Sequence, residues 1–182
     1  MPGLVPGIHV FSLILHSKTW MAGTSPAMTR SMAGNQITLR PYTPADEDAA
    51  IELWRHTWQQ HYPHIDFAKR TAWWRERWKQ ELAPTATISV AEAAGRMLGF
   101  VTVDRKTGYL DQIVVAPEAW GSEVGNLLMA EARRISPGGL DLKVNADNAR
   151  AIRFYEKQGF VDAGETVNEI SGAPVRLMRW RP

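Results

Sequence analysis

The feature that most restricts the fold of this chain is a loop with two glycines between a β-rich run and an apolar helix face. The run 109–115 leads to Pro117, and the glycines follow as Gly121 and Gly125. The next residues repeat at helical spacing and form one apolar face: Val124, Leu127, Leu128 and Ile135. Main-chain N–H groups at a helix N-terminus bind phosphate without basic side chains. The pattern therefore predicts a strand, a loop and a helix whose start forms a diphosphate site.

Other β-type segments predict strands along most of the chain. The expected strands cover residues 37–41, 87–93, 97–104, 109–115 and 140–144, and a further strand begins at Phe160. A turn at Ala94 and Gly95 joins the second and third strands as an antiparallel hairpin.

Helix signals separate these strands. Thr43, Pro44 and Asp46 supply a hydroxyl N-cap, a proline in the first turn and a carboxylate three residues after the cap. A second helix is expected over 67–82, and Asp147 is expected to cap a later helix. The initial order β-α-α-β-β-β lacks the strict alternation of strand and helix that a dinucleotide-binding fold requires.

Composition indicates one ordinary globular domain. Of the 182 residues, 45% are hydrophobic and 22% charged, so neither a disordered chain nor a fibre is indicated. The chain has no cysteine, which excludes a disulfide framework, a thiolate zinc site and a cysteine nucleophile. No stretch approaches the roughly 18 apolar residues of a membrane span. We therefore expect a cytoplasmic protein with no metal and no membrane partner.

The sequence pI of about 9.0 would favour an acidic partner, but the distribution of charge does not. Two of the 21 basic residues, Lys18 and Arg30, lie within residues 1–31, where no acidic residue occurs. The rest of the chain therefore carries 19 basic and 19 acidic side chains. In residues 75–81 the two signs alternate, which is typical of a solvated helix face. We expect no nucleic-acid partner.

A change of composition near Met32 divides the chain. Residues 1–31 contain Pro-Gly pairs and a Gly/Ser/Pro stretch, and they show no sustained helical or strand period. A secretory signal needs a positive segment before its apolar stretch, and no Lys or Arg precedes position 18. We expect residues 1–31 to be a disordered leader or a start assigned too far upstream, with an N-terminal strand as the alternative. Residues 32–182 then form the folded domain.

A second block of residues lies downstream of the glycine loop. It follows the pattern Asn-x-x-Ala-x-x-Phe-Tyr-x-x-x-Gly-Phe and consists of Asn148, Ala151, Phe154, Tyr155, Gly159 and Phe160. With Val115, Pro117 and Glu118, this block resembles the fingerprint of the GNAT superfamily of N-acetyltransferases, over residues 36–182. The resemblance implies an α/β (α+β) fold with a mixed, mostly antiparallel sheet flanked by helices, in the order β-α-α-β-β-β-α-β-α-β-β.

The resemblance also implies acetyl-CoA as the donor and direct transfer to an amine. The pantetheine arm would lie along Ile113, Val114 and Val115, and a free N–H of Val115 would stabilise the oxyanion. The diphosphate would meet the main chain of the loop and helix start, which comprises Gly121, Ser122, Glu123, Val124, Gly125 and Asn126. Asn148 would contact the arm or only cap its helix, and Tyr155 would protonate the leaving thiolate or serve as a core aromatic.

Two positions depart from the family pattern. Trp120 stands where Gln or Arg is usual, and Glu123 stands where the first glycine of a pair is usual. A carboxylate beside a diphosphate costs electrostatic free energy, and a Cβ narrows the approach of the main chain. We therefore expect Glu123→Gly to tighten acetyl-CoA binding, and Trp120 to serve in loop packing.

The sequence does not mark the base that removes a proton from the amine. Some branches of the family place a Glu on the strand before the asparagine block, where this chain has Lys143. Asp111 is the first candidate, acting directly or through water, and His61 with Tyr62 is the second. A structural role is the alternative for each of them.

Aromatic residues of the first two predicted helices supply a wall for the acceptor. Most are expected in the core, because tryptophans at helical spacing usually pack against a sheet. Trp58, His61 and Tyr62 are the expected substrate contacts. The predicted partners are acetyl-CoA and an amine acceptor, and the chain is expected to be a monomer or homodimer. A non-catalytic acyl-CoA-binding regulatory module with the same fold is the alternative function.

Overall fold

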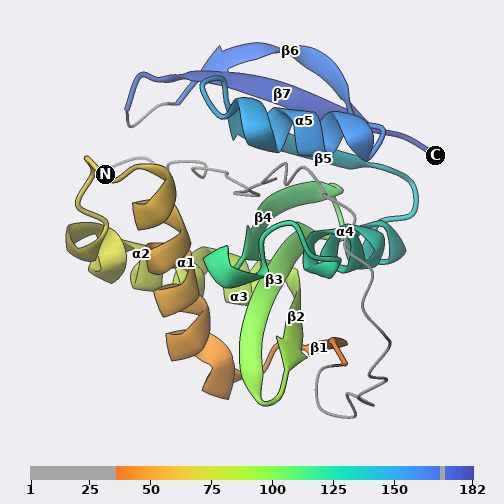
Figure 1. Ribbon diagram of the computed structural model, residues 1–182. Helices are drawn as coiled ribbons and strands as arrows, with labels where there is room; N and C mark the ends of the chain where they lie inside the picture. The colour runs from red at the N-terminus through yellow and green to blue at the C-terminus, as the bar shows by residue number, and fades with distance from the viewer. Residues whose placement is uncertain (1–35, 169–170) are drawn as a thin grey trace, which may run out of the picture.

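The computed structural model describes residues 36–168 and 171–182, which form a seven-stranded sheet with helices against it (Figure 1). The sheet order is β1-β2-β3-β4-β5-β7-β6. The strands are β1 Thr38–Pro41, β2 Thr87–Ala93, β3 Arg96–Asp104, β4 Tyr109–Val115, β5 Leu140–Asn145, β6 Val161–Val167 and β7 Pro174–Trp180. Neighbouring strands are antiparallel except β4 and β5, which are parallel. The expected mixed, mostly antiparallel sheet is confirmed.

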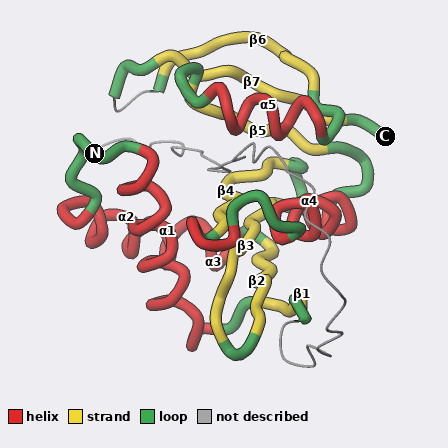
Figure 2. The backbone as a smooth tube through the Cα atoms, viewed as in Figure 1, coloured by secondary structure: helices red, strands yellow, loops and turns green. Residues whose placement is uncertain are grey.

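The helices connect these strands in the expected order (Figure 2). They are α1 Glu47–His61, α2 Thr71–Arg77, α3 Ala83–Thr85, α4 Val124–Ile135 and α5 Ala149–Lys157. The second predicted helix is an interrupted run over 68–85, in which a 3-10 turn precedes α2 and a π turn, Trp78–Leu82, joins α2 to α3. The predicted leader, residues 1–31, lies outside the described residues.

Two apolar clusters hold the layers together. Aromatic side chains of α1 and α2 pack on the strand residues Ile88, Val90, Phe100 and Val114. The neighbouring strand positions Val101, Ile113 and Val115 instead join α4 and α5 in the other cluster. Because successive strand residues point to opposite faces, α1 and α2 cover one face of the sheet and α4 and α5 the other.

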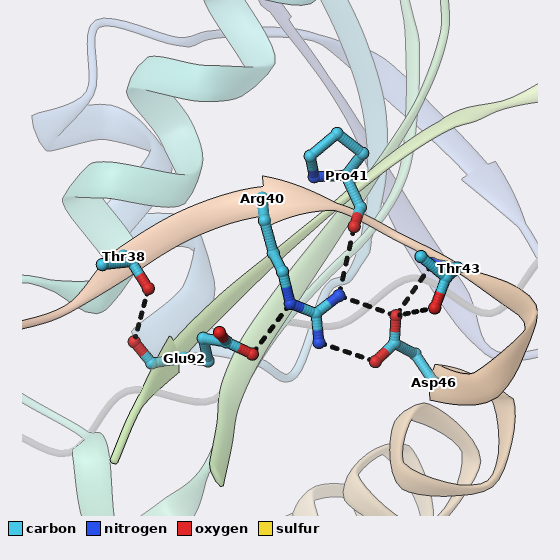
Figure 3. Close-up of polar contacts among 6 residues, drawn as sticks. All are labelled: Thr38, Arg40, Pro41, Thr43, Asp46 and Glu92. Carbon is cyan, nitrogen blue, oxygen red and sulfur yellow. Dashed lines mark hydrogen bonds and ion pairs between the residues drawn. The ribbon is translucent and has the colours of Figure 1, made fainter. Parts of the chain in front are cut away.

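An ion-pair network fixes the start of α1 to the edge of the sheet (Figure 3). Arg40 in β1 donates to both carboxylate oxygens of Asp46 at 2.8 and 2.7 Å, and to Glu92 of β2 at 2.8 Å. The Asp46 carboxylate also accepts the Thr43 main-chain N–H at 2.8 Å. Asp46 therefore reaches back to the chain before the helix, as the spacing of Thr43, Pro44 and Asp46 predicts. The Arg40 guanidinium holds the pKa of Asp46 well below its usual range.

Gly99 lets α4 approach the sheet closely. A Cβ at this position would lie 2.6 Å from the Val114 carbonyl oxygen and 2.8 Å from Cδ1 of Leu128. It would also meet Val124, the first residue of α4, at 3.2 Å. Because Gly99 has no side chain, the start of α4 can pack closely on β3 and β4.

Candidate active site

The parallel strands β4 and β5 diverge at the centre of the sheet. Within the described residues their ladder holds one Cα pair, Tyr109 with Asp141, and the Asp141 N–H donates to the Gly108 carbonyl at 3.0 Å. Beyond this pair the sheet divides into a part containing β1 to β4 and a part containing β5 to β7 (Figure 1). We call the space between the two main chains beyond this pair the β4–β5 gap.

The main chain of Val115 faces the β4–β5 gap. The next residue, Ala116, donates its N–H to the Leu98 carbonyl at 2.8 Å and so faces β3. Main-chain polar groups of successive strand residues point to opposite sides, so the N–H and C=O of Val115 point away from β3. The orientation predicted for Val115 agrees with this geometry, while its role in oxyanion binding stays a prediction.

Trp120 bonds to the same residue. Its indole Nε1 donates to the Val115 carbonyl at 2.8 Å. Across from it, the Arg150 guanidinium of α5 stacks on the indole, 4.5 Å from the ring centroid. Burial, aided by Arg153, lowers the pKa of Arg150 to about 10. Trp120 therefore links β4 to α5 across the gap, which is a more specific contact than the loop packing expected from the sequence.

The loop before α4 contains a glycine in the left-handed region and a serine that bonds within the loop. Gly121 has a φ of 78°, a conformation that glycine adopts without steric cost. Ser122 Oγ donates to the Ala119 carbonyl at 2.6 Å and accepts the Val124 N–H at 3.3 Å. The helix begins at Val124, three residues after Gly121.

Glu123 occupies the N-cap position of α4 without blocking the helix start. Its side chain is exposed and makes no capping hydrogen bond, while its carbonyl accepts the Leu127 N–H at 2.9 Å. The N–H groups of the first helical residues have no partner within a helix, and here those residues include Gly125 and Asn126. Of the first three helical residues, Val124 and Gly125 are buried and Asn126 is exposed, and the cofactor contacts predicted for 121–126 stay predictions.

Asn148, not Asp147, caps α5, which corrects the sequence prediction. The Asn148 Oδ1 accepts the Ala151 N–H at 3.0 Å, and the side chain is fully buried. Asp147 is exposed and accepts instead from the Tyr62 hydroxyl at 2.8 Å. Both residue types form N-caps readily, so adjacent Asp and Asn leave the sequence ambiguous by one position. The capping role of Asn148 is confirmed, and its contact with a pantetheine arm stays a prediction.

Tyr155 lies in the packed interior of the α5 side of the sheet. Its side chain is 2% exposed, and its ring lies 5.6 and 5.5 Å from the rings of Phe154 and Phe160. Burial raises the pKa of Tyr155. The pKa of Tyr109 in β4 is also raised, chiefly by burial and next by the charge of Asp111. The acid role of Tyr155 stays a prediction.

Asp111 is paired with an arginine from α2. The Arg77 guanidinium donates to its two carboxylate oxygens at 3.1 and 2.6 Å, and Gln112 Nε2 adds a bond at 3.0 Å. In the β3–β4 register Asp111 is an extra residue, because Thr102 pairs with Gln112 and the next pair skips to Leu110. This bulge turns Asp111 toward α2. Its role as a base stays a prediction, and the guanidinium on both oxygens argues against it.

The last turn of α1 reaches the far wall of the gap, which the end of β5 and the start of α5 form. The Tyr62 hydroxyl donates to Asp147 Oδ1 at 2.8 Å and accepts from Asn145 Nδ2 at 3.0 Å. His61 packs its ring edge-on to Tyr62 with centroids 4.4 Å apart, and burial lowers the pKa of His61. Trp58 stacks on Tyr62 at 5.8 Å but is only 2% exposed. The substrate contacts predicted for these three residues stay predictions.

Sequence reasoning missed Arg150, Asn145 and the position of Asp147 at the gap. Arg150 occupies a variable position of the downstream block, and only its contact with Trp120 gives it a place. Tyr62 and Asn145 are 83 residues apart, so no local period connects them. No group of three or more metal-binding side chains, and no helix able to cross a membrane, occurs in the part of the chain that the structure describes.

A family model and several known proteins resemble this chain. The model described as Acetyltransferase (GNAT) family matches residues 47–160, more than half of the chain. Peptidyl-lysine N-acetyltransferase YjaB of Salmonella typhimurium is 25% identical over 143 residues, covering 78% of this chain and 95% of that protein. Mycothiol acetyltransferase of Kineococcus radiotolerans is 28% identical over 170 residues, covering 87% of this chain and 54% of that protein. The chain thus spans about half the length of the second relative.

Solved structures share the fold. The solution structure of apo YjaB from Escherichia coli superposes with a TM-score of 0.66 at 20% identity, covering 80% of this chain and 97% of that one. A GCN5-related N-acetyltransferase from Rhodopseudomonas palustris gives a TM-score of 0.64 at 21% identity, covering 84% and 100%.

Proposed function

Because this chain belongs to the acetyltransferase (GNAT) family, we propose that it transfers an acetyl group from acetyl-CoA to a primary amine by direct attack in a ternary complex. The observation that carries the proposal is the divergence of β4 and β5, with the main chain of Val115 directed into the gap. An N–H fixed in that position donates to a carbonyl oxygen as it gains negative charge, without reorganisation during the reaction.

The residues around the gap fit the shape and charge of the donor. Ile113, Val114 and Val115 offer an extended edge for a pantetheine arm, because β5 leaves that edge unpaired at the Val115 end. The N–H groups at the start of α4 suit a diphosphate, and Glu123 and Asn126 are exposed there while Val124 and Gly125 are buried. The Trp120 indole donates a hydrogen bond to the Val115 carbonyl, and this bond must break before an amide of the pantetheine arm can donate to that oxygen.

Tyr155 is the proposed acid for the leaving thiolate. Burial raises the pKa of Tyr155, so the phenol stays protonated at neutral pH and retains a proton to donate. In the proposed reaction the amine nitrogen bonds to the thioester carbon, the carbon–sulfur bond breaks, and the thiolate takes the Tyr155 proton. The nitrogen then loses one N–H proton to solvent, and a solvent proton restores the Tyr155 phenol. Because the phenol lies in the packed interior, a small rearrangement near Phe154 and Phe160 must accompany donor binding.

The names of the relatives indicate which amine acceptors to test first. Two YjaB proteins are named peptidyl-lysine N-acetyltransferases, and a third relative is a mycothiol acetyltransferase. We propose a primary amine, with the ε-amino group of a peptidyl lysine as the first compound to test.

The proposal is tested by thiol release from acetyl-CoA over a panel of lysine peptides and small amines. Wild type should release thiol only when an amine is present, and Tyr155→Phe should lower kcat about 100-fold without changing acetyl-CoA affinity. Tyr42 packs against the cluster of α1 and α2, on the face of the sheet opposite Tyr155, so Tyr42→Phe should retain full kcat. Acetyl-CoA binding without amine-dependent release would reject the enzyme and favour an acyl-CoA-binding regulatory module.

A further inference from the structure

The end of α1 lies against both walls of the β4–β5 gap. On the near wall, Thr57 Oγ1 lies 3.4 Å from the Val115 carbonyl oxygen. On the far wall, the Tyr62 hydroxyl bonds to Asp147 and Asn145 at the end of β5. The six residues from Thr57 to Tyr62 therefore cross the mouth of the gap.

His61 is the side chain of this crossing whose ordinary pKa lies near neutral pH. It follows Thr57 by four residues, so it lies on the same helix face and about 6 Å further along the axis. The His61 ring packs edge-on against Tyr62, with centroids 4.4 Å apart, and the Tyr62 hydroxyl bonds to Asp147 on the far wall. The imidazole thus lies beside the contact between the end of α1 and the segment before α5.

The protonation state of His61 suits a proton acceptor. Burial lowers its pKa, Asp147 raises it and Arg150 lowers it, with a net displacement below the ordinary 6.5. At neutral pH the ring is therefore uncharged and has one nitrogen available to accept a proton. Asp111, in contrast, has a guanidinium on both carboxylate oxygens.

Asp147 supplies a fixed negative charge at the same mouth. The Tyr62 hydroxyl holds Oδ1 at 2.8 Å, and Asn145 in turn donates to Tyr62 at 3.0 Å, so the carboxylate has a defined position although it is exposed. A carboxylate attracts the ammonium form of an amine, which is the form that most primary amines have at neutral pH.

We propose that His61 accepts the proton that the acceptor ammonium loses, and that Asp147, positioned by Tyr62 and Asn145, attracts that ammonium to the gap. In this step one N–H bond of the ammonium breaks, the proton bonds to the free ring nitrogen, and the neutral amine attacks the thioester carbon. The imidazolium then releases its proton to water. The inference rests on the proposed acetyltransferase function and adds a base and a cationic acceptor to it.

The pH profile of kcat/KM tests the role of His61. Wild-type kcat/KM should rise with pH through an inflection below 6.5, because the base must be unprotonated. His61→Gln should lower kcat at least 100-fold and remove that inflection, with acetyl-CoA affinity in calorimetry unchanged. His56→Gln, an exposed histidine of the same helix, should retain the wild-type profile.

Two charge variants sharpen the test, because they should move the inflection in opposite directions. Asp147→Asn removes a charge that raises the pKa of His61, so the inflection should move to lower pH, while KM for the amine rises about tenfold. Arg150→Gln removes a charge that lowers this pKa, so the inflection should move to higher pH.

The outcomes separate the two proposals. If wild type transfers acetyl groups and His61→Gln keeps its kcat and inflection, the role of His61 is wrong and the acetyltransferase function stands. If the charge variants leave the inflection unmoved, His61 is not the titrating group. If wild type releases no thiol with any amine, the function and the inference fail together.

Discussion

Tryptophan serves two different purposes in this molecule, one in the helical cluster and one at the gap. In the cluster of α1 and α2, Trp54 and Trp74 stack at 4.6 Å and are at most 1% exposed. Their indole nitrogens, and that of Trp58, have no hydrogen-bond partner among the described residues. At the gap, Trp120 is partly exposed and gives its N–H to the Val115 carbonyl.

The difference separates stability from function. Buried aromatic rings stabilise the fold through apolar area and close packing, and they tolerate an unsatisfied indole N–H only because that area is large. At the gap the main-chain groups of a strand lack a partner strand, so side chains of the loop and of α5 gather around them. We therefore expect substitutions in the cluster to change stability, and substitutions at the gap to change ligand binding.

The largest expected effect is on the cluster. Trp74→Ala should lower the free energy of unfolding by about 3–5 kcal/mol, because it leaves a cavity against Trp54. The neighbouring Trp73 is 37% exposed, and Trp73→Ala should cost less than about 1 kcal/mol. Urea unfolding of both variants measures this, and equal losses would contradict the assignment of Trp74 to the core.

A smaller effect is expected where α4 meets the sheet. Gly99→Ala should cost about 1–3 kcal/mol, because its Cβ would meet the Val114 carbonyl and the Leu128 side chain. It should also weaken acetyl-CoA binding, since Val124 and the helix start must shift. Gly138→Ala is the matched control, because a Cβ there meets nothing within 4 Å. If Gly99→Ala unfolds in urea like the control, α4 is not held against the strands by this contact.

The smallest effect is expected at Trp120, where stability should fall while acetyl-CoA affinity rises. Trp120→Phe keeps a ring under Arg150 but removes the donor to the Val115 carbonyl. Stability should fall by about 0.5–1.5 kcal/mol, the net contribution of one hydrogen bond. Acetyl-CoA affinity should rise a few-fold, because the carbonyl becomes available to the pantetheine arm. Weaker binding in calorimetry would mean that the indole supports the donor site.

The sequence predicts most of the fold, because periodicity and capping act over a few residues. The strand at 109–115, the hairpin turn at Ala94 and Gly95 and the reach of Asp46 back to Thr43 all follow from local pattern. The sequence pattern predicts the cap of α5 one residue early, since Asp147 and Asn148 are both good capping residues.

The contacts at the site could not be predicted in the same way. Arg77 pairs with Asp111 over 34 residues, and Tyr62 with Asp147 over 85, so their meeting depends on how the helices pack on the sheet. A motif identifies the residues of a site, but it does not show which other side chains are bonded to them. The hydrogen bond from the Trp120 indole to the Val115 carbonyl and the pairing of Arg77 with Asp111 are two such contacts.

The most direct test of the central claim is the main-chain amide of Val115 in a nitrogen-15 NMR titration with acetyl-CoA. The Val115 amide and those of Gly125 and Asn126 should shift in proportion to occupancy, while the amide of Gly138, beyond the opposite end of α4, should not. Saturable acetyl-CoA binding that leaves the Val115 amide unmoved would contradict the account.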